Sequence, residues 1–246
     1  EGTCIALAEA GYMARAERRP EGISLDGQLE DVLYGLEQLR NHPDVDKSQV
    51  AVMGFSRGGL LALQAAIERP DDIDAVVLMA PAPGQDAMEE TLADVSELVA
   101  PVHIYIAKND NQGRHDLVQL AEQVEQTLRE AGKDVQLTVY PPFAANGHEL
   151  FFEVRDSYWS DVVEFLDEIS VNQDQSKYIN KSILGHSTVD NTLKGMSVVV
   201  DVAEELNFVP DSDVRLESGT IPEAGIDPDT GTVYLYYTVG PDGYVT

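Results

Sequence analysis

The amino-acid sequence predicts an α/β protein, in which a mostly parallel sheet carries helices on both faces and a small β-rich segment follows. Short apolar runs, such as 49–54 and 102–107, alternate with longer stretches of helical periodicity over residues 1–170. Apolar strands of this length, separated by helices, are typical of parallel sheets that are buried on both faces. Reactive groups in such sheets gather at the carboxyl ends of the strands.

The expected helices have apolar residues three or four positions apart, and the expected strands are short, mostly apolar runs between turn signals. In chain order the elements are helix 2–10, strand 12–16, helix 29–39, strand 49–54, helix 60–67, strand 74–80, strand 102–107, helix 117–128, strand 135–140 and helix 159–169. Pro70, Pro81 and Gly132 stand just beyond three of these elements. Residues of these types commonly end helices and strands.

Composition limits the classes of partner. The sequence holds 44 acidic and 16 basic residues, a formal net charge of −28. Such a surface repels nucleic acid and anionic membranes, so we expect a solvated acidic surface, with a specific cationic partner as the alternative. No stretch approaches the roughly 20 apolar residues that a membrane helix needs. The single cysteine, Cys4, excludes an intrachain disulfide and a cysteine metal site.

The ends of the sequence suggest a fragment. It begins with Glu1 rather than methionine, inside a helical pattern, and stops at Thr246 inside a strand-like pattern. A missing signal peptide is therefore uninformative, and both cytoplasmic and secreted locations stay open.

The residues Gly54-Phe55-Ser56-Arg57-Gly58-Gly59 directly follow an expected strand and open a helix. This is a G-x-S-x-G nucleophile elbow in the strand–turn–helix context that the motif requires. The turn lifts the Ser56 hydroxyl above the sheet and directs the Arg57 backbone N–H toward a developing oxyanion. A glycine-rich helix start that merely packs closely is the alternative.

A serine hydroxyl needs a base, which should be a histidine held by a later acid in the order Ser, Asp, His. Of the five histidines, His148 follows the expected strand 135–140, where the base belongs. The others lie before the serine, inside a strand, at a helix start or beyond the core: His42, His103, His115 and His186. Asp110 follows strand 102–107 and is the expected acid. Its rival Asp116 lies in the first turn of a helix, where the macrodipole alone explains it.

Three motifs resemble the dienelactone hydrolase-like branch of the α/β-hydrolase superfamily: GFSRGG around Ser56, AKND ending at Asp110, and NGHELFF around His148. The resemblance covers about residues 1–170 and implies an α/β-hydrolase fold with its first strands missing. It also implies Ser56 as nucleophile, Asp110 as acid and His148 as base. Dienelactone hydrolases proper have a cysteine at the elbow, so Ser56 favours a general esterase. The family's loop that donates the second oxyanion N–H precedes the first helix of this chain, leaving Arg57 as the one donor that can be named.

These residues predict a serine hydrolase that cleaves carboxylic esters or lactones through an acyl-enzyme, with no cofactor or metal. The Arg57 side chain could also clamp a substrate carboxylate, although local packing is the simpler interpretation. One alternative is a prolyl oligopeptidase-type serine peptidase. Another is a catalytically incomplete hydrolase fold that carries a binding module.

Beyond residue 170 the character of the sequence changes. Residues 171–195 are polar and predict a linker, and 196–246 predict a β-rich segment that could begin a second domain. The turn-rich 227–231 and the strand-like 232–239 resemble the opening of a sialidase- or glycosidase-type propeller blade, which would imply carbohydrate contact. A simple hairpin with aromatic cross-strand pairs explains them equally.

Overall fold

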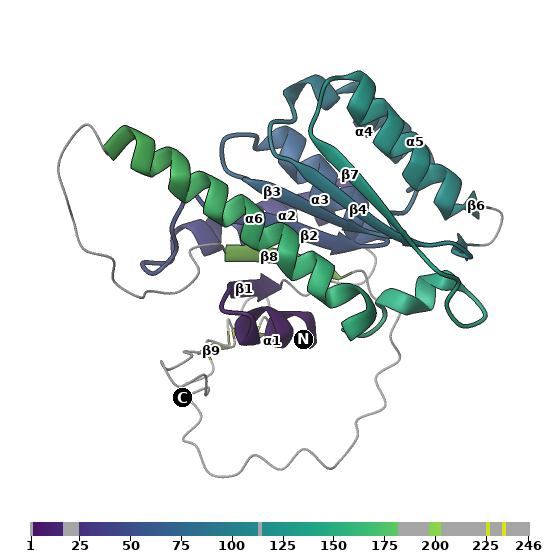
Figure 1. Cartoon of the computed structure of the whole chain (residues 1–246), viewed down its shortest axis with the longest axis horizontal. Helices are drawn as coiled ribbons and strands as arrows, with labels where there is room; N and C mark the ends of the chain where they lie inside the picture. The colour runs from purple at the N-terminus through teal and green to yellow at the C-terminus, as the bar shows by residue number, and fades with distance from the viewer. Residues whose placement is uncertain are drawn as a thin grey trace, which may run out of the picture. The chain divides into compact units, whose positions relative to one another are not determined.

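Six parallel strands form the main sheet of this computed structural model, in the order β1-β8-β2-β3-β4-β7 (Figure 1). The structure describes residues 2–16, 25–112, 115–181, 197–202, 225–226 and 233–234. The strands are β1 (Met13–Ala16), β2 (Val50–Phe55), β3 (Ala75–Met79), β4 (Val102–Ala107), β7 (Val135–Tyr140) and β8 (Ser197–Val202). Every residue of β2, β3 and β4 is buried. These three strands therefore form the centre of the core, as their continuous apolar runs predict.

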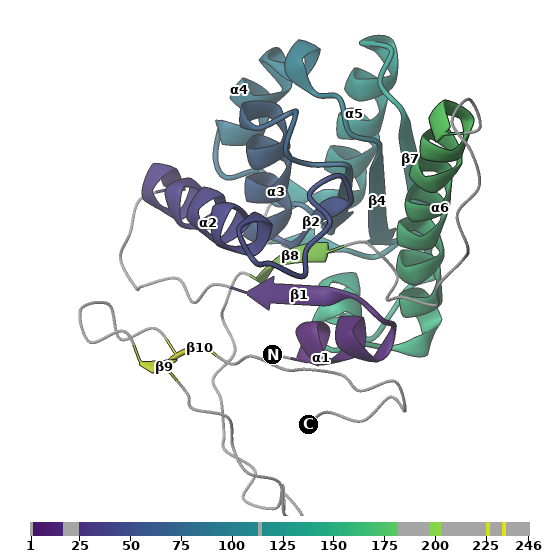
Figure 2. The ribbon, with the colours of Figure 1, turned by 90° about the vertical axis from the view of Figure 1, so that its left-hand side faces the viewer.

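Helices cover both faces of this sheet. They are α1 (Gly2–Glu9), α2 (Leu25–Arg40), α3 (Arg57–Glu68), α4 (Ala87–Ala93), α5 (Leu117–Glu130) and α6 (Asp156–Lys181). Figure 2 shows α2, α3 and α5 on one face and α1 and α6 on the other. Among the residues that the structure describes, none of the helices is long and apolar enough to span a membrane.

The predicted α/β class and parallel sheet are confirmed, and most elements fall within a few residues of their expected bounds. The helix α2 begins at Leu25 rather than at 29, and α3 begins at Arg57 rather than at 60. Gly58 and Gly59 are poor helix formers, so the propensity signal starts only after them. Shorter elements were not predicted, namely α4, the 3₁₀ turns at Val95–Glu97 and Gly147–Phe151, and the small hairpin of β5 (Asn111–Gln112) with β6 (His115–Asp116).

The first structural unit extends further than the predicted boundary at residue 170. The helix α6 continues to Lys181, because no glycine or proline interrupts the polar residues after 170. The strand β8 then joins the main sheet, where it pairs with β1 on one side and with β2 on the other. The chain accordingly divides into one unit over Glu1–Ala203 and a second over Glu204–Thr246. The predicted β-rich segment at 196–246 is thus shared between the two units.

Within the second unit, β9 (Gly225–Ile226) and β10 (Val233–Tyr234) pair antiparallel. This pairing matches a hairpin around the expected turn at 227–231, which itself lies outside the described residues. The resemblance to a propeller blade stays a prediction.

Candidate functional site

The backbone at Ser56 has a conformation that L-residues rarely adopt, with φ 54° and ψ −116°. Ser56 stands between the last residue of β2 and the first residue of α3. Its N–H donates to the Met79 carbonyl at 2.9 Å, and its carbonyl accepts from the N–H groups of Gly59 (3.0 Å) and Ala82 (2.9 Å). The end of β3 and the start of α3 therefore hold the strained turn in place.

Two glycines that flank this turn lie very close to neighbouring residues. A Cβ on Gly54 would lie 2.0 Å from the carbonyl oxygen of Gly58, and a Cβ on Gly59 would lie 3.1 Å from Pro81. The first contact involves backbone that cannot move aside without opening the turn. This is the structural reason for the first glycine of the G-x-S-x-G pattern, and Gly59 is the residue directly after the pattern.

The first turn of α3 places the Arg57 backbone N–H next to Ser56. Arg57 is the first residue of the helix, so its N–H has no acceptor within the helix and lies at the positive end of the macrodipole. The Arg57 side chain is exposed. A role for this guanidinium in binding a substrate carboxylate remains a prediction.

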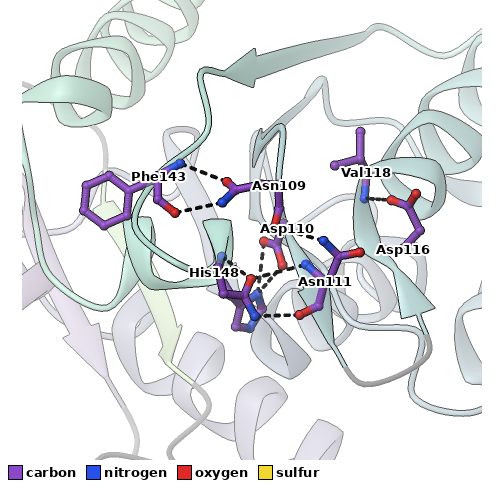
Figure 3. Close-up of polar contacts among 8 residues, drawn as sticks. Asn109, Asp110, Asn111, Asp116, Val118, Phe143 and His148 are labelled. Carbon is purple, nitrogen blue, oxygen red and sulfur yellow. Dashed lines mark hydrogen bonds and ion pairs between the residues drawn. The ribbon is translucent and has the colours of Figure 1, made fainter.

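Asp110 and His148 form a buried pair at the carboxyl ends of two adjacent strands, β4 and β7 (Figure 3). The His148 Nδ1 lies 3.0 Å from Asp110 Oδ1 and 3.1 Å from Oδ2. Asp110 is fully buried and His148 is 8% exposed. A buried carboxylate is stable only when it is paired. The His148 Nδ1 should therefore carry a hydrogen and donate it in a hydrogen bond to the Asp110 carboxylate. This tautomer leaves the Nε2 lone pair of His148 free to accept a proton.

Aromatic packing places the His148 ring beside the serine turn. The ring centroid lies 4.6 Å from that of Phe55, the residue that precedes Ser56. Phe152 packs edge-on against both rings, 5.8 Å from Phe55 and 6.1 Å from His148. The structure therefore joins Asp110 to His148 directly and brings His148 to the elbow through Phe55. Among the described residues, no hydrogen bond links the Ser56 hydroxyl to the imidazole.

The rejected candidates have other roles in the structure. Asp116 is an exposed N-cap, and its carboxylate accepts from the N–H groups of Val118 and Gln119. His103 lies inside β4, bonded to Thr138 and Tyr105, and burial lowers its pKa to about 4. The other two described histidines lie on the helix-end turn after α2 and in β6, at positions 42 and 115. His186 lies outside the described residues.

Sequence reasoning missed the groups around the pair, chiefly the aromatic rings and two asparagines that flank Asp110 and His148. Both asparagines read as ordinary turn residues in the sequence. The paired phenylalanines of NGHELFF were visible, but nothing local indicated that Phe152 would pack on the imidazole. Within the described part of the chain, no cluster of three or more His, Cys, Asp or Glu side chains could hold a metal ion.

A parallel sheet with a serine at a strained strand–helix turn, followed along the chain by an acid and a histidine at later strand ends, defines an α/β-hydrolase. The particular family follows from direct comparison. The family model described as the dienelactone hydrolase family matches residues 24–170, more than half of the sequence. The chain belongs to this family, and the expected resemblance is confirmed. Residues 24–170 are thus the part of the chain that carries this family's features.

Solved structures of several hydrolases are similar to this chain. A predicted CIB-like hydrolase from Thermoplasma acidophilum is 19% identical with a TM-score of 0.45, covering 60% of this chain and 64% of its own. A dienelactone hydrolase from Anabaena variabilis is 21% identical with a TM-score of 0.46, covering 61% of each chain. Dipeptidyl peptidase 4 from Porphyromonas gingivalis is 18% identical with a TM-score of 0.47, covering 57% of this chain and 22% of its own. The match thus spans less than two thirds of each of these proteins, and no curated protein matches.

Proposed function

We propose that this protein is a serine hydrolase that cleaves carboxylic esters or lactones through an acyl-enzyme intermediate. The observation that carries the proposal is the buried Asp110–His148 pair, which lies against Phe55 and therefore beside the strained Ser56 turn. An imidazole held in one tautomer by a carboxylate is the base that a serine hydroxyl needs at neutral pH.

In the first half of the reaction, the Ser56 Oγ attacks the carbonyl carbon of the substrate while His148 Nε2 takes the hydroxyl proton. The carbonyl oxygen becomes an oxyanion, and the Arg57 N–H at the start of α3 donates to it. As the C–O bond to the leaving alcohol breaks, His148 returns the proton to the alcohol oxygen. An acyl group now esterifies Ser56, and in a lactone the alcohol stays attached to that acyl group.

In the second half, water replaces the alcohol. His148 removes a proton from a water molecule, whose oxygen attacks the acyl carbon. The resulting oxyanion collapses, the bond to Ser56 Oγ breaks, and His148 protonates this oxygen to regenerate the hydroxyl. Asp110 stabilises the imidazolium in both halves without taking its proton. Phe152 packs against Phe55 and the imidazole and is 44% exposed, and its apolar surface suits an acyl or alcohol group of low polarity.

The test is labelling with a fluorophosphonate, together with turnover of p-nitrophenyl acetate. We expect wild-type protein to be labelled on Ser56, and Ser56→Ala to lose both labelling and turnover. The matched control is Asp116→Ala, which deletes the rival carboxylate and its two capping bonds but leaves Asp110 in place. It should keep activity within threefold of wild type. Labelling that survives Ser56→Ala, or activity that disappears in Asp116→Ala while Asp110→Ala is active, would overturn the assignment.

A prolyl oligopeptidase-type peptidase shares this core and is the second candidate. Assaying short esters beside proline-containing peptide amides with the same protein separates the two. The proposal predicts ester or lactone turnover with amide turnover at least 100-fold slower in kcat/KM. Carbohydrate contact by residues 196–246 stays a prediction, because the residues that would form a sugar site lie outside the described parts.

A further inference from the structure

Two asparagines link the loop that carries Asp110 to the loop that carries His148. Asn146, two residues before His148, reaches the backbone of Asn111. Its Oδ1 accepts from the Asn111 N–H at 3.2 Å, and its Nδ2 donates to the Asn111 carbonyl at 2.6 Å. The same Oδ1 also accepts from the His148 N–H at 3.1 Å. One side chain therefore bonds both to the base and to the residue that follows the acid.

Asn109, the residue before Asp110, makes the reciprocal link. Its Oδ1 accepts from the Phe143 N–H at 2.8 Å, and its Nδ2 donates to the Phe143 carbonyl at 3.0 Å. Each asparagine thus bonds two ways with a backbone segment 34 or 35 residues away in the chain. Beyond the ends of β4 and β7, these side-chain bonds take the place of the backbone hydrogen bonds that join the two strands.

A primary amide is suited to this task because it carries an acceptor and a donor in one plane, as the peptide group does. Aspartate in its place could only accept, serine is too short to bridge, and alanine could do neither. Between them, the two amides satisfy both polar groups of the backbone at Phe143 and at Asn111. The two amides therefore hold the acid loop and the base loop together at the residue before Asp110 and at the residue after it, in addition to the Gly147 N–H, which donates to the Asn109 carbonyl at 3.2 Å.

We propose that Asn109 and Asn146 are positioning residues that set the distance and orientation between Asp110 and His148. The inference rests on the proposed function, because it presumes that this pair activates Ser56. Neither asparagine touches the substrate. Each acts on the reaction by keeping the imidazole in the orientation that serves the hydroxyl, where displacement by about 1 Å costs on the order of 100-fold in rate.

The experiment compares Asn146→Ala, Asn146→Ser and Asn109→Asp with wild-type protein. Serine can still cap the turn by accepting from the His148 N–H, but it cannot bridge to Asn111. Asn109→Asp keeps the bond from the Phe143 N–H and loses the donation to the Phe143 carbonyl. We expect kcat for p-nitrophenyl acetate and the fluorophosphonate labelling rate to fall 10- to 100-fold in each variant, with KM changed less than threefold. In Asn146→Ser the melting temperature should recover toward wild type while kcat stays at least tenfold low.

Lys133→Met is the matched control. The Lys133 ammonium donates to the carbonyls of Ser96 and Leu98, both at 2.7 Å, across a similar sequence separation. It therefore also joins two segments through two bonds, but at the amino end of β7, away from the site. The control should lose thermal stability and keep its kcat within twofold.

The low-field proton resonance of the His148 Nδ1–H···Asp110 bond gives an independent reading. It should broaden or disappear in Asn146→Ala and stay sharp in Lys133→Met. Wild-type kcat in Asn146→Ala or in Asn109→Asp, or full recovery of kcat by Asn146→Ser, would overturn the positioning role. So would a loss of kcat in Lys133→Met equal to that in the asparagine variants. These outcomes differ from failure of the proposed function, in which Ser56→Ala itself stays active.

Discussion

The substitution Gly147→Ala tests how closely the base loop must approach the acid loop. A Cβ at this position would lie 2.7 Å from the Ala107 Cβ, 2.8 Å from the Asn109 Oδ1 and 2.8 Å from the Asp110 N. Ordinary carbon contacts begin near 3.5–4.0 Å, so the loops must separate by about 1 Å to admit the methyl group. The Asp110 backbone cannot yield on its own, because its N–H donates to the Ala107 carbonyl at 3.0 Å.

The expected loss follows from that displacement. Moving a catalytic group by about 1 Å costs on the order of 100-fold in rate, which corresponds to about 2.7 kcal/mol of activation free energy. Overpacking should also lower the free energy of unfolding by about 1–3 kcal/mol. The assay is steady-state hydrolysis of p-nitrophenyl acetate at a temperature where urea titration shows the variant fully folded.

Gly132→Ala is the control for Gly147→Ala. Gly132 has φ +74° and no atom within 4 Å of its Cβ position, so alanine there strains the backbone without touching the site. It should cost about 1 kcal/mol of stability and leave kcat unchanged. Wild-type kcat in Gly147→Ala, or an equal loss of kcat in Gly132→Ala, would show that close contact between the two loops does not set the rate.

Two further predictions concern single polar groups. Asp110→Asn should lower kcat by about 10⁴-fold, because an amide can bond to the wrong imidazole tautomer. Circular dichroism should show the fold unchanged. A loss of kcat below tenfold would count against Asp110 as the acid. Burial lowers the pKa of His103 to about 4 in the folded protein, whereas a histidine in the unfolded chain has a pKa near 6.5. Between these pH values the unfolded chain takes up a proton at His103 and the folded protein does not. Its contribution to stability is therefore complete above about pH 6.5 and is lost as the pH falls toward 4. Melting temperatures measured from pH 7 to 4 should fall less steeply in His103→Gln than in wild type, and equal slopes would contradict this.

Local sequence information was sufficient to predict the parts of the candidate site that depend on local backbone structure, namely a tight turn or the end of a strand. The elbow at Ser56 was predictable because a glycine-flanked serine between an apolar run and a helix has few other uses. Asp110 could be chosen over Asp116 because only Asp110 directly follows a buried strand. In the structure Asp116 is the N-cap of α5, and Asp110 bonds to His148.

Long-range pairing could not be predicted in the same way. The sequence of Ser197–Val202 does not indicate that this strand pairs with β1 and β2, which precede it by more than 140 residues. An apolar run specifies burial, whereas its neighbours depend on which edges the rest of the fold leaves open. The amides of Asn109 and Asn146 were equally invisible, because an asparagine in a loop has the same local signal whether it makes a turn or bridges two loops.

The order of the strands explains why the linking residues Asn109, Asn146 and Gly147 lie between the acid loop and the base loop rather than around the serine. Ala107 and Tyr140 are level in the β4–β7 pairing, so the acid and base loops start side by side. Ser56 follows β2, which is three strands away from β7 in the sheet, a distance of about 14 Å at about 4.8 Å per strand. The loop after Tyr140 must therefore cross the ends of β4 and β3 before His148 can serve the elbow. A loop that spans such a distance would swing about its anchor unless it were held near its far end. Asn109, Asn146 and the close approach of Gly147 hold this loop against the acid loop just before His148, and the imidazole packs against Phe55.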